Sequence, residues 1–146
     1  MRVPLFLIIA AILATLVVVA NCQKTAIQPV AIEANDMCSF CRMSISEKRY
    51  AAELIDSDGQ ASKFDDIGCM ANFINQKKSS APIRARFVMD LNRHEWLKAE
   101  NAFYVRSSEF KTPMNGGMVA FKDEAGAGEA ATKYHGALLR FDEVIK

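Results

Sequence analysis

The sequence is poor in the residues from which enzyme active sites and nucleic-acid surfaces are usually built. It has only two histidines, His94 and His135, whose spacing forms no metal-binding pair, and it shows no phosphate-binding loop and no nucleophile beside a base. Its 18 basic and 17 acidic residues nearly cancel, which argues against nucleic acid or an anionic membrane surface as the main partner. Seven glycines and four prolines in 146 residues are too few for a collagenous or disordered chain. These absences predict one globular domain without catalytic activity.

One long apolar run stands at the start of the chain. Arg2 is the only charged residue before Cys22, and residues 3–20 carry no charge at all. A positive charge, an apolar core and a small residue in this order predict an export signal over residues 1–21. A permanent transmembrane helix is the alternative, because the run is just long enough to span a bilayer. Both interpretations place the folded part of the chain outside the cytoplasm.

The end of this run, Val19-Ala20-Asn21-Cys22, resembles a bacterial lipobox, in which the cysteine is lipidated and becomes the new N-terminus. Asn21 departs from the small residue that is usual before that cysteine. We expect acyl chains on Cys22 to anchor the protein in a cell membrane, facing the periplasm, and Gln23 to favour the outer membrane over the inner one. Residues 22–35 show no helical or strand period and are predicted to form a lipidated tether.

After the tether, one pattern of predicted elements occurs twice. Alternating apolar residues predict strands, Asp58-Gly59 predicts a hairpin turn, and an aspartate before an apolar stripe predicts the start of each helix. The first copy predicts strands at residues 49–56, 61–64 and 84–89 with a helix after Asp65-Asp66, and the second predicts strands at 102–106, 118–121 and 137–141 with a helix after Asp123. We therefore predict an α+β fold for residues 36–146, in which two tandem ββαβ units, about 36–91 and 92–146, share one core. Chance similarity between two ββαβ runs is the alternative.

The stretch richest in chemistry is Asp36-Met37-Cys38-Ser39-Phe40-Cys41-Arg42-Met43. Cys41 and Met43 are two residues apart, so in an extended backbone their sulfurs project from the same side. A thiolate and a thioether are soft donors that select Cu(I) over hard cations, whereas thioethers are not among the usual ligands of zinc. A C-x-M motif that overlaps C-x-x-C in an exported protein therefore indicates a copper site.

Three other interpretations of this stretch remain open. Cys38 and Cys41 form a structural disulfide in the first, because the compartment is oxidising. They form a redox pair in the second, although the residues that follow do not predict the long helix of a thioredoxin-like motif. Met43 is a core residue in the third, as most methionines are. Elsewhere, Cys69 is interpreted as a small buried residue rather than a ligand, and Asp65-Asp66 as helix caps rather than acids.

Several separated motifs resemble, in the same order, those of the NosL family. They are Cys38-Ser39-Phe40-Cys41-Arg42-Met43, Arg49-Tyr50-Ala51-Ala52-Glu53, Phe64-Asp65-Asp66-Ile67-Gly68-Cys69-Met70, Ala102-Phe103-Tyr104-Val105, Thr112-Pro113-Met114 and Ala120-Phe121. The resemblance covers residues 36 to about 143, and the leader with its cysteine agrees with it. Members of the family are copper-binding accessory lipoproteins for the maturation of nitrous oxide reductase. The family usually has glycine where Arg42 stands, a difference that removes no donor.

The resemblance implies a membrane-anchored Cu(I) carrier that faces the periplasm and is not an enzyme. It implies two partners, an ABC-type copper-handling transporter and the apo form of nitrous oxide reductase. The implied copper ligands are Cys41 and Met43 from C-x-M and Met114 from Thr-Pro-Met, with Cys38 as an auxiliary ligand. Pro113 restrains the backbone before Met114, which suits a fixed third donor between the two repeats. The alternative function is an exported thiol–disulfide oxidoreductase that uses Cys38 and Cys41.

Overall fold

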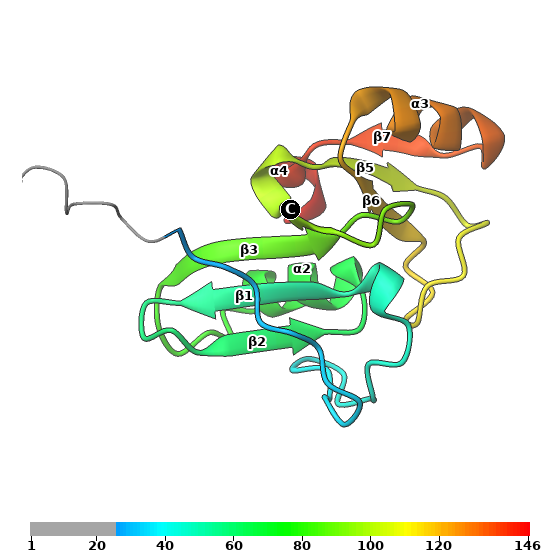
Figure 1. The fold of residues 1–146 in the computed structure, drawn as a ribbon. Coiled ribbons are helices and arrows are strands. Elements are labelled where there is room, and N and C mark those ends of the chain that lie inside the picture. The colour runs from blue at the N-terminus through cyan, green and yellow to red at the C-terminus, as the bar shows by residue number, and fades with distance from the viewer. Residues whose placement is uncertain (1–25) are drawn as a thin grey trace, which may run out of the picture.

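Two antiparallel sheets, each with one principal helix, make up the fold of residues 26–146, the part of the chain that this computed structural model describes (Figure 1). The predicted export signal and the predicted lipidation site Cys22 lie outside the described residues. Within residues 26–146, no helix combines the length and the apolar character needed to cross a membrane.

The first unit places its helix on one face of a four-stranded sheet with the order β2-β1-β3-β4. Its elements are η1 (Lys48–Tyr50), β1 (Ala52–Asp56), β2 (Ala61–Phe64), α2 (Ile67–Asn75), β3 (Ile83–Met89) and β4 (Trp96–Lys98). All neighbouring strands are antiparallel. The predicted hairpin and the predicted helix are confirmed. Strand β4 was not predicted, because three residues are too few to show alternation.

The second unit repeats this arrangement with a three-stranded sheet of order β6-β5-β7. Its elements are η2 (Ala99–Asn101), β5 (Phe103–Arg106), β6 (Met118–Phe121), α3 (Glu124–Lys133), β7 (Ala137–Leu139) and α4 (Phe141–Val144). In both units the first strand is central, with its hairpin partner on one side and the strand that follows the helix on the other. The prediction of an α+β fold with two ββαβ units is therefore confirmed, whereas the short C-terminal α4 was not predicted.

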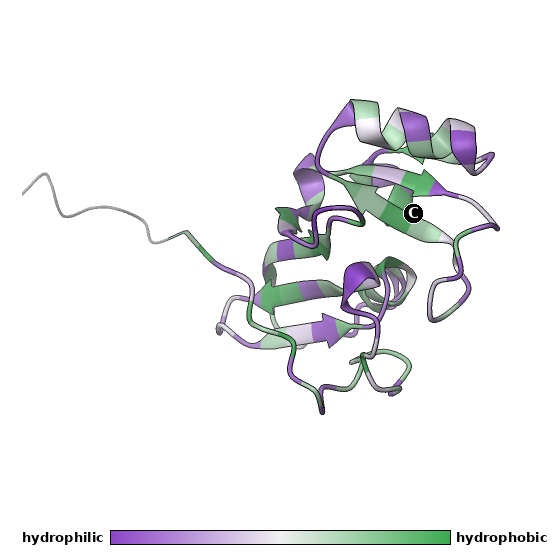
Figure 2. Cartoon of the chain, turned by 45° about the vertical axis from the view of Figure 1, so that its right-hand side comes forward, coloured by the Kyte–Doolittle hydropathy of each residue, from purple (hydrophilic) through white to green (hydrophobic). Residues whose placement is uncertain are grey.

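One hydrophobic core joins the two units. Met70 of α2 is fully buried in a cluster that also contains Tyr104 and Met118 from the second sheet. A second cluster fills the space under α3, where Ala127 and Ala130 are buried. Figure 2 shows the strands of the second sheet as largely hydrophobic and much of α3 as hydrophilic. A helix that is apolar only along one stripe rests on a sheet and leaves its other side in water.

Both helices begin at an aspartate cap, as predicted. The Asp66 side chain accepts a hydrogen bond from the Cys69 N–H (2.8 Å), and Asp123 accepts one from the Gly126 N–H (2.8 Å). Each bond satisfies one of the free N–H groups at the start of a helix. The equivalent caps place Phe64 and Phe121 at equivalent positions, as the last residues of β2 and β6.

The segment before the thiol-rich stretch crosses the face of the first sheet opposite α2 (Figure 1). The Val30 N–H donates to Glu53 Oε1 (2.8 Å), and Ile32 is buried. Residues 30–35, which fall in the predicted tether, therefore include part of the folded body. Any free tether ends before Val30.

Candidate metal centre

Residues 38–43, the thiol turn, form a tight turn rather than an extended segment. The Cys38 N–H donates to the Met43 carbonyl (2.8 Å), and the Arg42 N–H donates to the Cys38 carbonyl (3.0 Å). Arg42 has a φ of +67°, in the left-handed region. The expectation that the Cys41 and Met43 side chains project together from an extended backbone is therefore wrong, because the left-handed residue between them reverses the chain.

Three thiols and one carboxylate, two of the thiols from this turn, lie close together. The Sγ atoms of Cys38, Cys41 and Cys69 and a carboxylate oxygen of Asp65 all lie within 4.8 Å of one another. The three cysteines are free thiols, and the Cys41 thiol donates to Asp65 Oδ2 (3.3 Å). Cys38, Asp65 and Cys69 are buried, whereas Cys41 is half-buried. We call these four residues the thiol cluster.

The fold gathers the thiol cluster from three segments. The thiol turn supplies two cysteines and is fastened to β2 by a hydrogen bond from the Ser39 N–H to the Lys63 carbonyl (2.8 Å). Asp65 follows β2 directly, and Cys69 lies in the first turn of α2. The sequence interpretation missed Asp65 and Cys69 as candidate ligands, since it assigned one as a cap and the other as a small buried residue. Cys69 is buried as predicted, but the cap is Asp66. The available signal was the contiguous stretch Asp65-Asp66-Ile67-Gly68-Cys69, in which two possible ligands flank the start of the predicted helix.

The environment of the thiol cluster separates the pKa values of its cysteines. A hydrogen bond from the Cys69 thiol, together with the N–H groups of Asp65, Cys41 and Phe40, lowers the pKa of Cys38 to about 6. Burial raises the pKa of Cys41 to about 11. The pKa of Cys69 is raised, first by its hydrogen bond to Cys38 and then by burial. Without a metal, the cluster therefore holds its thiolate on Cys38 and its protons on the other two cysteines.

We expect one proton to leave the reduced, metal-free protein near pH 6, the pKa of Cys38. Because this pKa lies below the ordinary value of 9.0, the Cys38 thiolate stabilises the fold fully above pH 9 and loses that contribution as the pH falls through about 6. The far-ultraviolet absorbance of the thiolate measures the titration. The Cys38→Ser variant should show no thiolate until the pH rises above the ordinary value of 9.0, because burial raises the pKa of both remaining cysteines. An unchanged step near pH 6 in that variant would assign the thiolate to another residue.

The two methionines proposed as copper ligands are exposed at the surface. The Met43 side chain, at the end of the thiol turn, is 46% exposed, and Met114 is 44% exposed. The Met114 N–H donates to Asp66 Oδ2 (3.0 Å), which fastens the Thr-Pro-Met loop of the second unit to the start of α2. The structure thus brings the Met114 backbone to the helix end that carries Cys69. Met43 is not a core residue, so that alternative is wrong.

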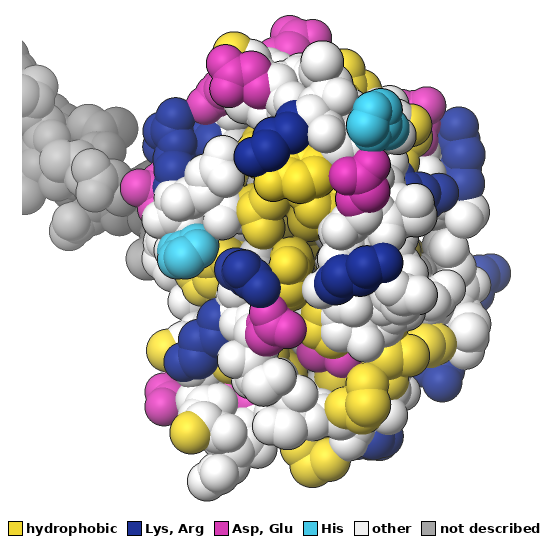
Figure 3. All heavy atoms as spheres, turned by 90° about the vertical axis from the view of Figure 1, so that its right-hand side faces the viewer, with side chains coloured by type: hydrophobic (Ala, Val, Ile, Leu, Met, Phe, Trp, Pro, Cys, Tyr) yellow, Lys and Arg dark blue, Asp and Glu magenta, His cyan; other side chains and the backbone are white. Residues whose placement is uncertain are grey.

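Two further expectations concern a thioredoxin-like motif and the two histidines. The C-x-x-C pair lies in a turn and is followed by no α-helix before β1, so the geometry of a thioredoxin-like motif is absent from this part of the described chain. His94 and His135 are both exposed and lie apart on one face of the molecule, among hydrophobic side chains that also reach the surface (Figure 3). Neither histidine belongs to the thiol cluster.

The left-handed backbone of Arg42 leads to a stability prediction. A side chain at positive φ costs about 1–2 kcal/mol, a cost that glycine avoids. We expect Arg42→Gly to leave the free energy of unfolding unchanged or to raise it by up to about 1 kcal/mol, since glycine also gains freedom in the unfolded chain. Arg42→Val, which is β-branched, should lower it by more than about 1 kcal/mol. Urea denaturation measures both, and equal midpoints for the two variants would contradict the prediction.

Comparisons with known proteins identify the family and the fold of the chain. The model of one protein family, NosL, matches residues 29–146. The crystal structure of the copper chaperone NosL from Shewanella denitrificans has a similar fold, with a TM-score of 0.71 and 23% sequence identity over 80% of this chain and 94% of that chain. None of the curated proteins compared with the sequence matches it.

Proposed function

Because this chain belongs to the NosL family, we propose that it is a membrane-anchored periplasmic Cu(I) chaperone that delivers copper for the maturation of nitrous oxide reductase. One observation carries the proposal. The Met43 and Met114 side chains are nearly half exposed, and the Cys41 thiol is half-buried. Met43 lies in the same turn as Cys41, and the Met114 backbone is hydrogen-bonded to Asp66, the residue after Asp65 of the thiol cluster, so the segments that carry these three soft donors are held together at the surface. Because the Met43 and Met114 side chains are exposed, packing of the core does not explain their presence.

Copper is the cargo in this proposal, and Cys41, Met43 and Met114 are its ligands. Cu(I) favours soft thiolate and thioether donors. A thioether on the surface can be replaced by a donor from another protein without unfolding either partner, whereas the thiolate holds the ion until the exchange is complete. Binding of Cu(I) to Cys41 displaces a proton, since the free thiol has a raised pKa. Cys38, hydrogen-bonded to Cys69, acts as the auxiliary ligand.

The partners follow from the same proposal. An ABC-type copper-handling transporter complex exchanges copper with the chaperone, and apo nitrous oxide reductase receives it. The membrane anchor is a lipid on Cys22. The exposed faces of Met43 and Met114 are where both partners would contact the ion.

The anchor is tested by one substitution. We expect Cys22→Ala to release the protein from the membrane or to leave an uncleaved precursor, because alanine cannot be acylated. Fractionation of cells and labelling with a radioactive fatty acid measure retention and acylation. Membrane retention with unchanged acylation in Cys22→Ala would overturn the lipoprotein proposal.

The function is tested by titrating the reduced mature protein, in detergent, with Cu(I) against a chelator of known affinity. We expect one Cu(I) per chain, followed by transfer of that copper to apo nitrous oxide reductase when the two proteins are mixed. A parallel assay of disulfide reduction tests the oxidoreductase alternative. Absence of Cu(I) binding, together with reductase activity that Cys38→Ser and Cys41→Ser both abolish, would replace the chaperone by that alternative.

A further inference from the structure

The turn that joins β3 to β4 is hydrogen-bonded to β6 through the Leu91 N–H and the Ala120 carbonyl, so we count it with the second unit, and it has the same backbone geometry as the thiol turn. In this charged turn, residues 90–95, the Asp90 N–H donates to the Glu95 carbonyl (2.9 Å), the His94 N–H donates to the Asp90 carbonyl (3.0 Å), and His94 has a φ of +55°. In the thiol turn, too, the first residue donates to the sixth and the fifth donates to the first. The fifth residue, Arg42, is left-handed like His94. The second residue of each turn donates to the penultimate residue of the hairpin's second strand, β2 in one unit and β6 in the other.

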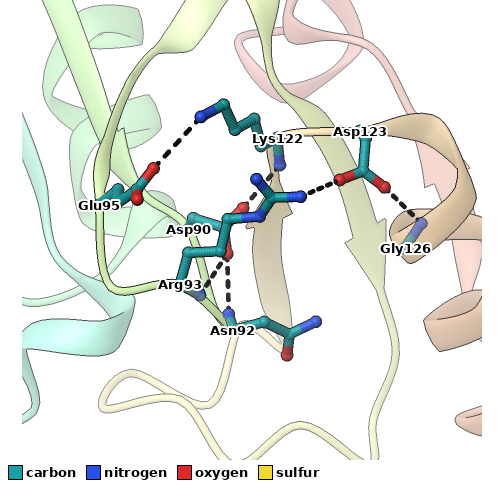
Figure 4. Close-up of polar contacts among 7 residues, drawn as sticks. All are labelled: Asp90, Asn92, Arg93, Glu95, Lys122, Asp123 and Gly126. Carbon is teal, nitrogen blue, oxygen red and sulfur yellow. Dashed lines mark hydrogen bonds and ion pairs between the residues drawn. The ribbon is translucent and has the colours of Figure 1, made fainter.

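The first residue of each turn accepts hydrogen bonds from equivalent N–H groups. Asp90 is 2% exposed and accepts from Asn92 (2.9 Å), Arg93 (2.7 Å) and Lys122 (2.7 Å), as Figure 4 shows. Cys38 accepts from the residues at the same three positions of the first unit. This pattern pairs Cys38 with Asp90, Cys41 with Arg93, Met43 with Glu95, Asp65 with Lys122, Asp66 with Asp123, and Cys69 with Gly126.

The two units differ in how they balance negative charge. In the second unit, two ion pairs of 2.8 and 3.3 Å place the side chains of Arg93 and Lys122 against carboxylates around the charged turn (Figure 4). In the first unit the equivalent residues are Cys41 and Asp65, and within residues 26–146 no lysine or arginine forms an ion pair with Asp65. Asp65 is only 1% exposed, and burial of a carboxylate without a cation is unfavourable. At the two positions where the second unit has the cationic side chains of Arg93 and Lys122, the first unit therefore has a thiol and a carboxylate, which are metal ligands.

We propose that a zinc-class divalent cation completes the thiol cluster, bound by the Sγ atoms of Cys38, Cys41 and Cys69 and by a carboxylate oxygen of Asp65. Four donors within 4.8 Å of one another are close to the tetrahedron that zinc needs, in which Zn–S distances of about 2.3 Å put the sulfurs about 3.8 Å apart. A shift of about 1 Å or less completes the site. This proposal does not rest on the copper function.

The donor set distinguishes this site from the copper site. A carboxylate with three cysteines suits four-coordinate zinc, whereas Cu(I) takes soft sulfur donors and gains nothing from Asp65. Three of the four donors are buried, as in closed structural zinc sites, and the half-buried Cys41 is the point of entry. Because Cys41 belongs to both donor sets, zinc in the cluster and Cu(I) at the surface exclude each other.

The probe is Co(II), which occupies zinc sites and gives intense visible bands when it is tetrahedral with thiolate ligands. We expect the reduced mature protein to bind one Co(II) with such bands, and Zn(II) to displace it. Cys69→Ser and Asp65→Asn should each weaken Co(II) binding at least about tenfold, since loss of even an outer-shell partner costs that much. The matched control, Met43→Leu with Met114→Leu, should bind Co(II) as the wild type does.

The outcomes separate this proposal from the copper function. Loss of Cu(I) binding in the methionine control, with Co(II) binding intact, supports two overlapping sites. Octahedral Co(II) bands, unchanged affinity in Cys69→Ser, or loss of Co(II) in the methionine control would overturn the zinc-class site. If the cluster variants do not fold, X-ray absorption of the Zn(II)-loaded wild type decides, because the proposal requires three sulfur ligands and one oxygen ligand per zinc.

Discussion

Cu(I) affinity should fall at least about a hundredfold, or about 3 kcal/mol, in Cys41→Ser, because a hydroxyl is a hard and poor donor for Cu(I). Cys38→Ser should cost far less. Met43→Leu and Met114→Leu should each weaken binding by about tenfold or more, and the two together should leave only weak thiolate binding. Both methionines are nearly half exposed, so leucine should leave the fold intact. Competition with a chelator of known affinity measures each variant, with circular dichroism as the folding control.

The same titration has a pH dependence of known sign. Cu(I) must displace the proton of Cys41, whose pKa is raised to about 11, so affinity should rise with pH by up to about tenfold per unit below that value. The Cys41→Ser variant should lose this dependence. Full Cu(I) affinity in the double methionine variant would mean that the exposed thioethers do not bind copper. A larger loss in Cys38→Ser than in Cys41→Ser would make Cys38, rather than Cys41, the principal thiolate ligand.

Gly117→Ala should destabilise the fold by about 3 kcal/mol or more and displace the loop that carries Met114. Gly117 has a φ of +60°, and a Cβ atom there would lie 2.1 Å from the Ser107 carbonyl oxygen. Both clashing groups belong to backbone, so rotation of a side chain cannot relieve the overlap. The Gly117 carbonyl also accepts from the Ser107 N–H (2.9 Å), and its N–H donates to Thr112 Oγ1 (3.2 Å). These bonds hold the Thr-Pro-Met loop against the second sheet.

The neighbouring glycine provides the matched control for this prediction. A Cβ atom on Gly116 would meet nothing within 4 Å, and the backbone of Gly116 is not left-handed. Gly116→Ala should therefore change the urea midpoint little, whereas Gly117→Ala should lower it strongly and weaken Cu(I) binding. Equal midpoints for the two variants would show that the loop can move away from Ser107 at no cost.

Much of the fold was open to prediction because its signals are local. The alternation in β1, the Asp58-Gly59 turn and the caps Asp66 and Asp123 depend on neighbours within a few residues, and each was identified. Strand β4 and helix α4 escaped prediction because they are three and four residues long and owe their form to packing. The order of the strands and the shared core depend on contacts between distant segments, which no local period encodes.

The features of the candidate site also fall into those that local motifs indicate and those that depend on tertiary structure. The sequence by itself determined the family, and it led to the prediction of the C-x-M donors, because both rest on contiguous motifs. Only the tertiary structure decided that Asp65 and Cys69 join Cys38 and Cys41, since β2 and α2 must pack behind the thiol turn to bring them together. It also decided which thiol is ionised, because a pKa depends on burial and on donors from other segments. The thiol turn and the charged turn share no residue type at any of their six positions. Their likeness is visible only in three dimensions, since backbone N–H groups bind a buried thiolate and a buried carboxylate alike.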